Sequence, residues 1–112
     1  MSKYRAKPTM VDGIRFDSKA EAHYYLYLKS EKDKGNIASL ELQPAFVLQE
    51  GFKKNGKKYR PITYVADFKV TWKDGTEEII DVKGKRTEVY GIKRKWFEHR
   101  YPKLTIKEIK VG

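Results

Sequence analysis

The sequence predicts a small α/β domain in which two helices accompany an antiparallel sheet. Residues 19–34 place apolar side chains at helical spacing, and residues 89–101 do so again. Between these two segments the apolar residues alternate with a period of two, and turn signals at Asn55-Gly56 and Asp74-Gly75 interrupt them. The chain has 112 residues, which is enough for one hydrophobic core but not two, so we expect a single domain.

The amino-terminal part predicts a basic arm, a hairpin and the first helix. Residues 1–8 carry three cations and end at a proline, which favours a flexible arm. Residues 9–16 alternate around Asp12-Gly13, a short hairpin signal. The helix at 19–34 follows Ser18, which is a good N-cap residue.

The rest of the chain predicts four strands and a second helix. Strands at 45–52, 59–72 and 77–83 are joined by short turns, so we expect an antiparallel meander. The helix at 89–101 is stopped by Pro102, and residues 104–111 alternate apolar and charged side chains as a last strand does.

The turn after Trp72 decides which side chains face each other. A three-residue loop at 73–75, with its glycine left-handed, pairs Trp72 with Thr76 and places Asp67 opposite Asp81. A two-residue loop would point these aspartates to opposite faces. We prefer the longer loop, because it also gathers apolar side chains on the other face, namely Ala66, Phe68, Val70, Trp72, Ile80 and Val82.

Composition limits the function classes. Lys and Arg outnumber Asp and Glu by 25 to 15, giving a net charge of +10 and a pI near 9.7, which favours a polyanionic partner over a merely basic soluble protein. The absence of cysteine excludes disulfides and thiolate zinc sites, and two histidines argue against a histidine-rich metal site. No apolar run is long enough for a signal peptide or a membrane span, so we expect a cytoplasmic protein with no membrane partner.

Two aspartates and a lysine carry the strongest chemical signal. Asp67 and Asp81 stand in otherwise apolar strands, and Lys83 shares a strand face with Asp81. Two close carboxylates repel unless a cation lies between them, and Mg²⁺ prefers such oxygen ligands. Lys83 is then placed to act on an attacking water or on the developing phosphate charge. A cross-strand salt bridge at a sheet edge remains an equal alternative.

Glu21 and Lys93 are candidates with strong structural alternatives. Residues 18–21 form a capping box in which Glu21 reaches back to the Ser18 amide, yet its helix face also predicts a third acid near the sheet. Lys93 lies in the apolar arc of the second helix, so it either snorkels to solvent or serves the acidic cluster. Arg94 and Lys95 fall outside this arc and are interpreted as solvated, phosphate-facing charges.

A cationic hairpin tip is the candidate DNA contact. Its charges are Lys53, Lys54, Lys57, Lys58 and Arg60, set around the turn at Asn55-Gly56. Such a tip suits sequence-independent phosphate contacts, although a solvated loop explains it equally well. Tyr59 and Tyr64 are candidates for base stacking, with simple packing as the alternative.

With these residues assembled, the chain resembles the PD-(D/E)XK nuclease superfamily, which has the restriction-endonuclease-like fold. Asp67 matches the first motif aspartate, preceded by Ala66 instead of proline, and residues 81–83 match the (D/E)XK element. Glu21 matches the glutamate on the first helix, and Lys93 matches a basic residue on the later helix. The resemblance implies a mixed central sheet flanked by helices, built as helix, three-stranded meander, helix and strand.

The resemblance also implies a metal site and a reaction. It implies Mg²⁺ or Mn²⁺ bound by Glu21, Asp67, Asp81 and the Val82 carbonyl, with Lys83 as the catalytic lysine and no small-molecule cofactor. Gln43 is a weaker candidate for supporting the site.

A closer resemblance is to a small phage and prophage nuclease family. Its similarity covers nearly the whole chain, through segments 16–22, 43–44, 66–68, 81–84 and 87–95. We therefore expect a DNA endonuclease in the cytoplasm of a bacterial host. We expect it to be selective for branched DNA, as Holliday junction resolvases are, and to work as a homodimer in phage recombination or packaging. The alternatives are a nicking or terminase-associated nuclease with little structure preference, and a non-catalytic basic DNA-binding protein; RNA also remains open as a substrate.

Overall fold

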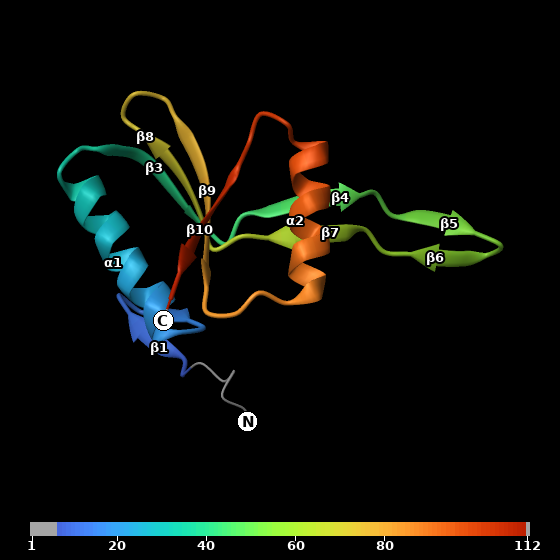
Figure 1. The fold of residues 1–112 in the computed structure, drawn as a ribbon, viewed down its shortest axis with the longest axis horizontal. Coiled ribbons are helices and arrows are strands. Elements are labelled where there is room, and N and C mark those ends of the chain that lie inside the picture. Colours follow the sequence, from blue (N-terminus) through green and yellow to red (C-terminus); the bar gives the residue numbers. More distant parts are fainter. Residues whose placement is uncertain (1–6, 112) are drawn as a thin grey trace.

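The computed structural model describes residues 7–111 and places a four-stranded sheet between two helices (Figure 1). The helix α1 (Lys19–Asp33) packs on one face of the sheet and α2 (Glu88–Arg100) lies on the other. The expected basic arm at 1–8 lies outside the described residues except for Lys7 and Pro8, which are exposed. No helix in the described range is long and apolar enough to cross a membrane.

The central sheet is mixed. Its order is β10 (Ile106–Lys110), β9 (Glu77–Lys83), β8 (Phe68–Trp72) and β3 (Ile37–Leu42). β10 runs parallel to β9, and the other neighbours are antiparallel. A parallel pair needs a crossover, and α2 supplies it, so this sheet has a helix on each face. The expectation of an α/β domain with a mixed sheet flanked by helices is confirmed at this level.

The helices begin and end where their caps predict. The Ser18 hydroxyl accepts a hydrogen bond from the Glu21 amide at the start of α1, and Lys34 is the C-cap. Thr87 caps α2 in the same way, and the helix ends at Tyr101, before Pro102. Only Tyr90 and Phe97 of α2 are fully buried. The apolar arc expected for this helix is therefore too broad. Val89 and Ile92 belong to the predicted arc but are 62% and 58% exposed.

The amino-terminal hairpin is confirmed. β1 (Thr9–Val11) pairs with β2 (Ile14–Phe16) around the turn at Asp12-Gly13. Phe16 is buried at the foot of α1, and Lys29 of α1 makes a 2.6 Å ion pair with Asp12. The hairpin is thus attached to the first helix and completes the core on that side.

The two strands expected at 45–52 and 59–72 are parts of one long, bent hairpin. Its outgoing side is β3, β4 (Ala45–Gln49) and β5 (Phe52–Lys54), and its returning side is β6 (Lys57–Tyr59), β7 (Ile62–Val65) and β8. The sequence prediction missed β3 as a strand and missed both bends.

Two prolines explain the bends. Pro44 and Pro61 donate no backbone hydrogen bond, so the ladder is broken beside each of them. At the first bend the Gln43 amide donates to the Asp67 carbonyl (2.9 Å) and the Ala66 amide donates to the Pro44 carbonyl (3.0 Å). The strand therefore turns between Ala66 and Asp67. The sequence predicted Ala66 on the same face as Phe68, but Ala66 packs in the core under α2.

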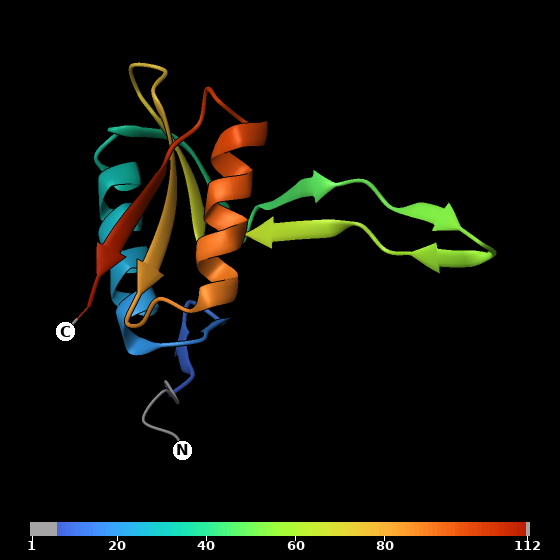
Figure 2. The same ribbon diagram turned by 45° about the vertical axis from the view of Figure 1, so that its right-hand side comes forward.

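The buried apolar side chains form two hydrophobic cores, one under each helix, so the expectation that this chain length supports only one core is wrong: the sheet separates the buried residues of its two faces. The core under α1 contains Leu28, Phe68, Val70 and Ile80, and the core under α2 contains Leu48, Tyr64, Ile79 and Phe97. Beyond the second core, β5 and β6 extend away from the rest of the molecule (Figure 2). The molecule accordingly measures 53 × 40 × 25 Å.

Candidate active site

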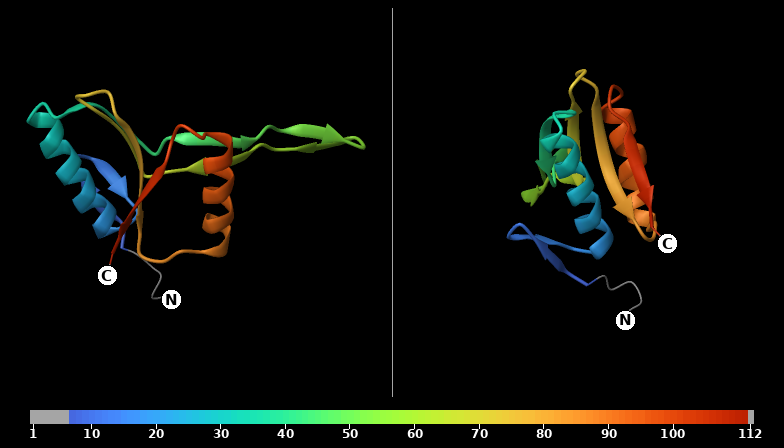
Figure 3. Two further views of the ribbon diagram at one scale, coloured as in Figure 1. Left: turned by 45° about the horizontal axis from the view of Figure 1, so that its top comes forward. Right: turned by 90° about the vertical axis from the view of Figure 1, so that its left-hand side faces the viewer.

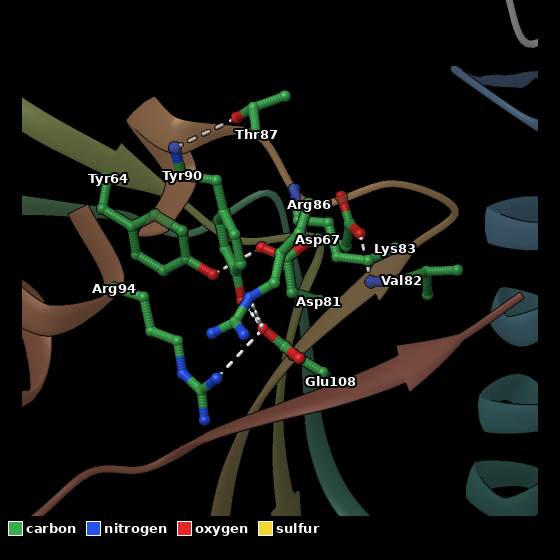
Figure 4. A network of polar contacts seen from close by, with 10 residues as sticks. All are labelled: Tyr64, Asp67, Asp81, Val82, Lys83, Arg86, Thr87, Tyr90, Arg94 and Glu108. Atoms are coloured by element: carbon green, nitrogen blue, oxygen red, sulfur yellow. Dashed lines mark hydrogen bonds and ion pairs between the residues drawn. The ribbon is translucent and has the colours of Figure 1, made fainter. Parts of the chain in front are cut away.

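The loop between β8 and β9 sets the register that brings the two aspartates together. Gly75 has φ +91°, and the Trp72 amide donates to the Thr76 carbonyl at 2.8 Å, so the loop has three residues as predicted. The ladder ends at the pair Phe68–Ile80, one residue before Asp67 and Asp81. The Val82 amide donates to Asp67 Oδ2 at 2.7 Å (Figure 4). Asp67 therefore lies at the bend of β8, beside the strand that carries Asp81.

Asp81 is held by two partners in the core under α2. It is 2% exposed, and the Tyr64 hydroxyl donates to its Oδ2 at 2.5 Å. Lys83 Nζ lies 3.0 Å from its Oδ1 and 4.1 Å from the centroid of the Tyr90 ring (Figure 4). The salt bridge that the sequence left open is thus present, but it joins a buried carboxylate to a lysine that is 28% exposed. The Asp81–Lys83 pair is therefore not the solvated salt bridge at a sheet edge that the sequence left open.

Glu21 lies within electrostatic range of the two aspartates. It is 5% exposed near the start of α1, and its pKa is raised to about 7 by burial, then by the charges of Asp67, Asp17 and Asp81. A hydrogen bond from the Asp17 backbone opposes this rise, so the carboxylate reaches back beyond the cap residue itself. Glu21 thus stands at the capped start of α1 and in the field of the other acids, but the partner of its carboxylate is the Asp17 backbone and not the Ser18 amide that the capping box predicted.

Asp67 is coupled to the same groups. Burial raises its pKa to about 6, the Val82 backbone amide lowers it, Asp81 raises it and Lys83 lowers it. Within residues 7–111, ion pairs reach Asp81 but neither Glu21 nor Asp67. Two carboxylates thus remain without a cation in a partly buried region of negative charge.

The donor chemistry fits a hard divalent cation. Carboxylate and carbonyl oxygens suit Mg²⁺ or Mn²⁺, and a cation near Glu21 and Asp67 would reduce the repulsion by neighbouring carboxylates that raises the pKa of each. As placed, no three acidic or histidine side chains in the described part of the chain are gathered closely enough to hold a metal. Both oxygens of Asp81 already have partners, Tyr64 and Lys83.

A network next to Asp81 was not foreseen. Glu108 of β10 is paired in register with Asp81 of β9, and its Oε2 accepts from the Tyr90 hydroxyl at 2.7 Å (Figure 4). Arg94 and Arg86 lie 3.1 and 3.2 Å from the same oxygen. These contacts fix the Tyr90 ring under Lys83. The pairing of β10 with β9 joins residues far apart in sequence, so no local signal announces it.

Two expectations for single residues need correction. Arg94 is not a solvated charge, because it is 29% exposed and pairs with Glu108 and Glu98. Tyr64 is not available for base stacking, because it is 3% exposed and bonded to Asp81. Its position could have been inferred from alternation, since an inward-facing tyrosine needs a polar partner for its hydroxyl.

The remaining candidates lie around the cluster or away from it. Gln43 is exposed and touches the site through its backbone bond to Asp67. Lys93 is half-buried on α2, without a hydrogen bond or ion pair among residues 7–111. Lys95 is exposed, as expected, and so are the tip cations Lys53, Lys54, Lys57, Lys58 and Arg60.

A comparison with known families identifies the chain. A family model described as a protein of unknown function, DUF1064, matches residues 1–111. The chain belongs to this family. No curated protein and no solved structure matches it. The DUF1064 match therefore covers the whole candidate site.

The raised carboxylate pKa values predict how stability of this DUF1064 protein depends on pH. The folded state holds protons on Glu21 and Asp67 up to about pH 7 and 6, whereas the unfolded chain loses them near its ordinary values. The free energy of unfolding is therefore expected to fall as pH rises from 5 to 8, by roughly 2–3 kcal/mol, and to level off above the folded pKa values. Urea unfolding in chelator at each pH measures this slope. A free energy that rises over the same interval would contradict the assignment.

Proposed function

We propose that this DUF1064 protein is a divalent-metal-dependent DNA endonuclease with a restriction-endonuclease-like, PD-(D/E)XK core. One observation carries the proposal: the bend of β8 sets Asp67 beside Asp81, with Lys83 Nζ 3.0 Å from Asp81 and the buried Glu21 in their electrostatic field. Two buried carboxylates, Glu21 and Asp81, and the half-buried Asp67 lower the stability of the fold, because desolvation and mutual repulsion both disfavour the charged groups, so their retention supports a functional role.

Each residue has a role in this proposal. Glu21, Asp67, Asp81 and the Val82 carbonyl would hold Mg²⁺ or Mn²⁺, which supplies a Lewis acid for a phosphodiester oxygen. Asp81 takes part by releasing Tyr64 or Lys83, since both of its oxygens are engaged. Lys83 orients the water that attacks phosphorus or neutralises the charge that develops as the P–O bond breaks. Lys93, half-buried on α2, is a secondary candidate for contact with the phosphate.

The substrate proposed is DNA, and branched DNA in particular. The net charge of +10 supports a polyanion, and the exposed cations of the β5–β6 hairpin extend the basic surface beyond the domain. We place the enzyme in phage recombination or packaging as a homodimer that makes paired cuts, similar to a Holliday junction resolvase. A nicking or terminase-associated nuclease without structure preference is the nearest alternative.

A non-catalytic DNA-binding protein is the second candidate function. It is favoured by two observations: Asp81 is already satisfied by Tyr64 and Lys83, and no ready-made metal group occurs in the described residues. Under this alternative Asp81 is a structural partner of Tyr64 and Lys83, and Glu21 and Asp67 bind no metal. That role fits poorly with the buried Glu21 and the half-buried Asp67, which have no ion pair among the described residues, and for this reason we rank it second.

Metal dependence tests the proposal. Wild-type protein is expected to cut labelled four-way junction, duplex or single strand in Mg²⁺ or Mn²⁺ and to cut none of them in EDTA, while binding persists in EDTA. Asp67→Asn is expected to lower the rate by about 10³-fold, since several kcal/mol of metal-derived stabilisation are lost. Gel analysis of products over time measures both.

The pattern of products separates the alternatives. Paired symmetric cuts on the junction alone identify a resolvase, and equal nicking of all duplexes identifies the less selective nuclease. The matched control is Asp74→Asn, which makes the same chemical change in the exposed β8–β9 loop and should cut at the wild-type rate. Tight binding without cutting in any metal would establish the DNA-binding protein.

A further inference from the structure

The hairpin formed by β5 and β6, residues 52–59, projects from the domain, and its side chains belong to neither hydrophobic core. From here on, the arm means this hairpin and not residues 1–8. Every residue from 50 to 61 is exposed, and the arm extends beyond α2 in the left-hand view of Figure 3. Its turn at Asn55-Gly56 has φ values of 51° and 77°, as a tight two-residue hairpin turn requires. At about 3.4 Å per residue, the five steps from Glu50 to Asn55 carry the turn roughly 17 Å outward.

The base of the arm contacts the rest of the domain, whereas its tip is exposed. Gly51 lies so close to the returning chain that a Cβ there would stand 2.9 Å from the Tyr59 carbonyl oxygen and 3.2 Å from Pro61 Cδ. Arg100 of α2 donates to the Leu48 carbonyl at 3.3 Å and lies 3.4 Å from the Glu50 carboxylate. These contacts attach the chain just before the arm to α2 and bring its two strands close together at Gly51.

The two faces of the arm differ. Phe52 pairs with Tyr59 and Lys54 pairs with Lys57, so these four side chains share one face, while Lys53 and Lys58 share the other. The rings of Phe52 and Tyr59 stack at 4.6 Å with an interplanar angle of 12°, yet the two side chains stay 43% and 39% exposed. Lys57 Nζ lies 5.1 Å from the centre of the Tyr59 ring. One face of the hairpin is thus an aromatic platform of two rings stacked on each other, with Lys57 over the Tyr59 ring and both rings still partly exposed.

The charges of the arm weaken it as an isolated structure. Lysines stand directly opposite each other in two successive cross-strand pairs, and like charges in such positions are destabilising. A two-stranded hairpin alone is only marginally stable in water. Within the described chain no acidic group makes an ion pair with Lys53, Lys54, Lys57, Lys58 or Arg60. A polyanion that neutralises these charges would stabilise the arm.

We infer that the arm is a binding site for unpaired bases of DNA, with Phe52 and Tyr59 stacking on the bases and the lysines contacting the flanking phosphates. Paired bases within a duplex present only their edges, whereas unpaired bases expose the ring faces on which an aromatic platform stacks. A second copy of the chain is disfavoured as the occupant, because it would bring another strongly positive arm or surface against these cations. The inference refines the proposed substrate class, but binding is testable without cleavage.

Fluorescence anisotropy in EDTA tests the arm with three labelled DNAs: a single-stranded oligothymidine, a perfect duplex, and the same duplex with an unpaired thymidine bulge. For the double variant Phe52→Ala/Tyr59→Ala we expect the Kd for single-stranded and bulged DNA to rise about 10²-fold. Duplex affinity should change less than threefold. The matched control is Tyr27→Ala, which removes a tyrosine that is 48% exposed on α1 and should bind as wild type does.

The cations have their own variant. Lys53→Gln/Lys58→Gln is expected to weaken binding to all three DNAs and to reduce the slope of log K against log salt by about 2. The control Lys32→Gln/Lys73→Gln removes the same charge from exposed positions elsewhere and should leave the slope closer to that of the wild type.

Two outcomes would overturn the inference: equal losses for duplex and single strand in the aromatic variant, or an unchanged affinity for both. A change of mass by light scattering in that variant, with DNA binding intact, would make the arm a contact between copies instead. Because no metal is present, the result is independent of nuclease activity. Arm-dependent binding without any cleavage in Mg²⁺ would defeat the proposed function alone, and cleavage without arm-dependent binding would defeat the inference alone.

Discussion

Replacing Lys83 with methionine is expected to lower the rate of DNA cleavage by about 10³-fold, while DNA affinity measured in EDTA stays at the wild-type level. Groups that position or exchange protons in a transition state contribute about 10²–10⁴-fold. Lys83 Nζ is the only described cation within 4 Å of a carboxylate of the Glu21, Asp67 and Asp81 cluster. Methionine keeps an unbranched stem that can pack on the Tyr90 ring. Single-turnover cleavage under saturating enzyme isolates the chemical step from binding.

The same change has a structural cost that must be measured separately. Without the ammonium, Asp81 keeps Tyr64 as its partner but loses its ion pair, so the methionine variant is expected to be less stable. Lys83→Arg is the control, because it restores the cation near Asp81 while replacing the compact ammonium with a planar guanidinium. We expect arginine to recover thermal stability without recovering the rate. Cleavage at the wild-type rate in both variants would remove Lys83 from the chemistry.

The parts of the fold that follow from local chemistry were predictable. The cap at Ser18, the stop at Pro102 and the three-residue loop with Gly75 act within a few residues, so the helices and the β8–β9 register could be inferred without tertiary information, although the cap at Thr87 was not predicted. The bends beside Pro44 and Pro61 were also marked in the sequence, but continuous alternation on both sides of each proline hid them. The strand β3 was missed because its ladder with β8 shifts register between Ile37 and Ser39, which disturbs the alternation.

The candidate site likewise contains residues that the sequence predicted and partners that it did not. Asp67, Asp81 and Lys83 were predictable because charged residues in apolar strands are conspicuous and the loop fixes their faces. The tyrosine and glutamate partners were not, because Tyr64 reaches Asp81 across the bend of the long hairpin and Glu108 arrives through the parallel pairing of β10. Sequence periodicity assigns a residue to a face but does not specify which distant strand lies beside it. The surroundings that tune Asp81 and Lys83 therefore needed the tertiary structure.

Glu21→Gln is expected to abolish most cleavage and, at the same time, to make the protein more stable at pH 8. Glutamine fits the N3 position of a capping box as glutamate does, so the helix start is kept. It removes a buried charge whose pKa is raised to about 7 by burial and by Asp67, Asp17 and Asp81. The gain in unfolding free energy should be about 1–3 kcal/mol at pH 8 and close to zero at pH 5, where Glu21 is already protonated.

Comparing the two pH values distinguishes a site residue from a helix cap. Glu31→Gln is the matched control on the same helix, since Glu31 pairs with Lys34 and Asn36 and its pKa is lowered, so losing its charge should not stabilise the protein at either pH. Chemical denaturation in EDTA measures the stability, and added Mg²⁺ should stabilise the wild type more than Glu21→Gln because a metal ligand has been removed. A variant with wild-type cleavage and equal stability changes at both pH values would leave Glu21 as a cap alone. A variant that is inactive but more stable at pH 8 would show that the fold tolerates a destabilising charge because the reaction requires it.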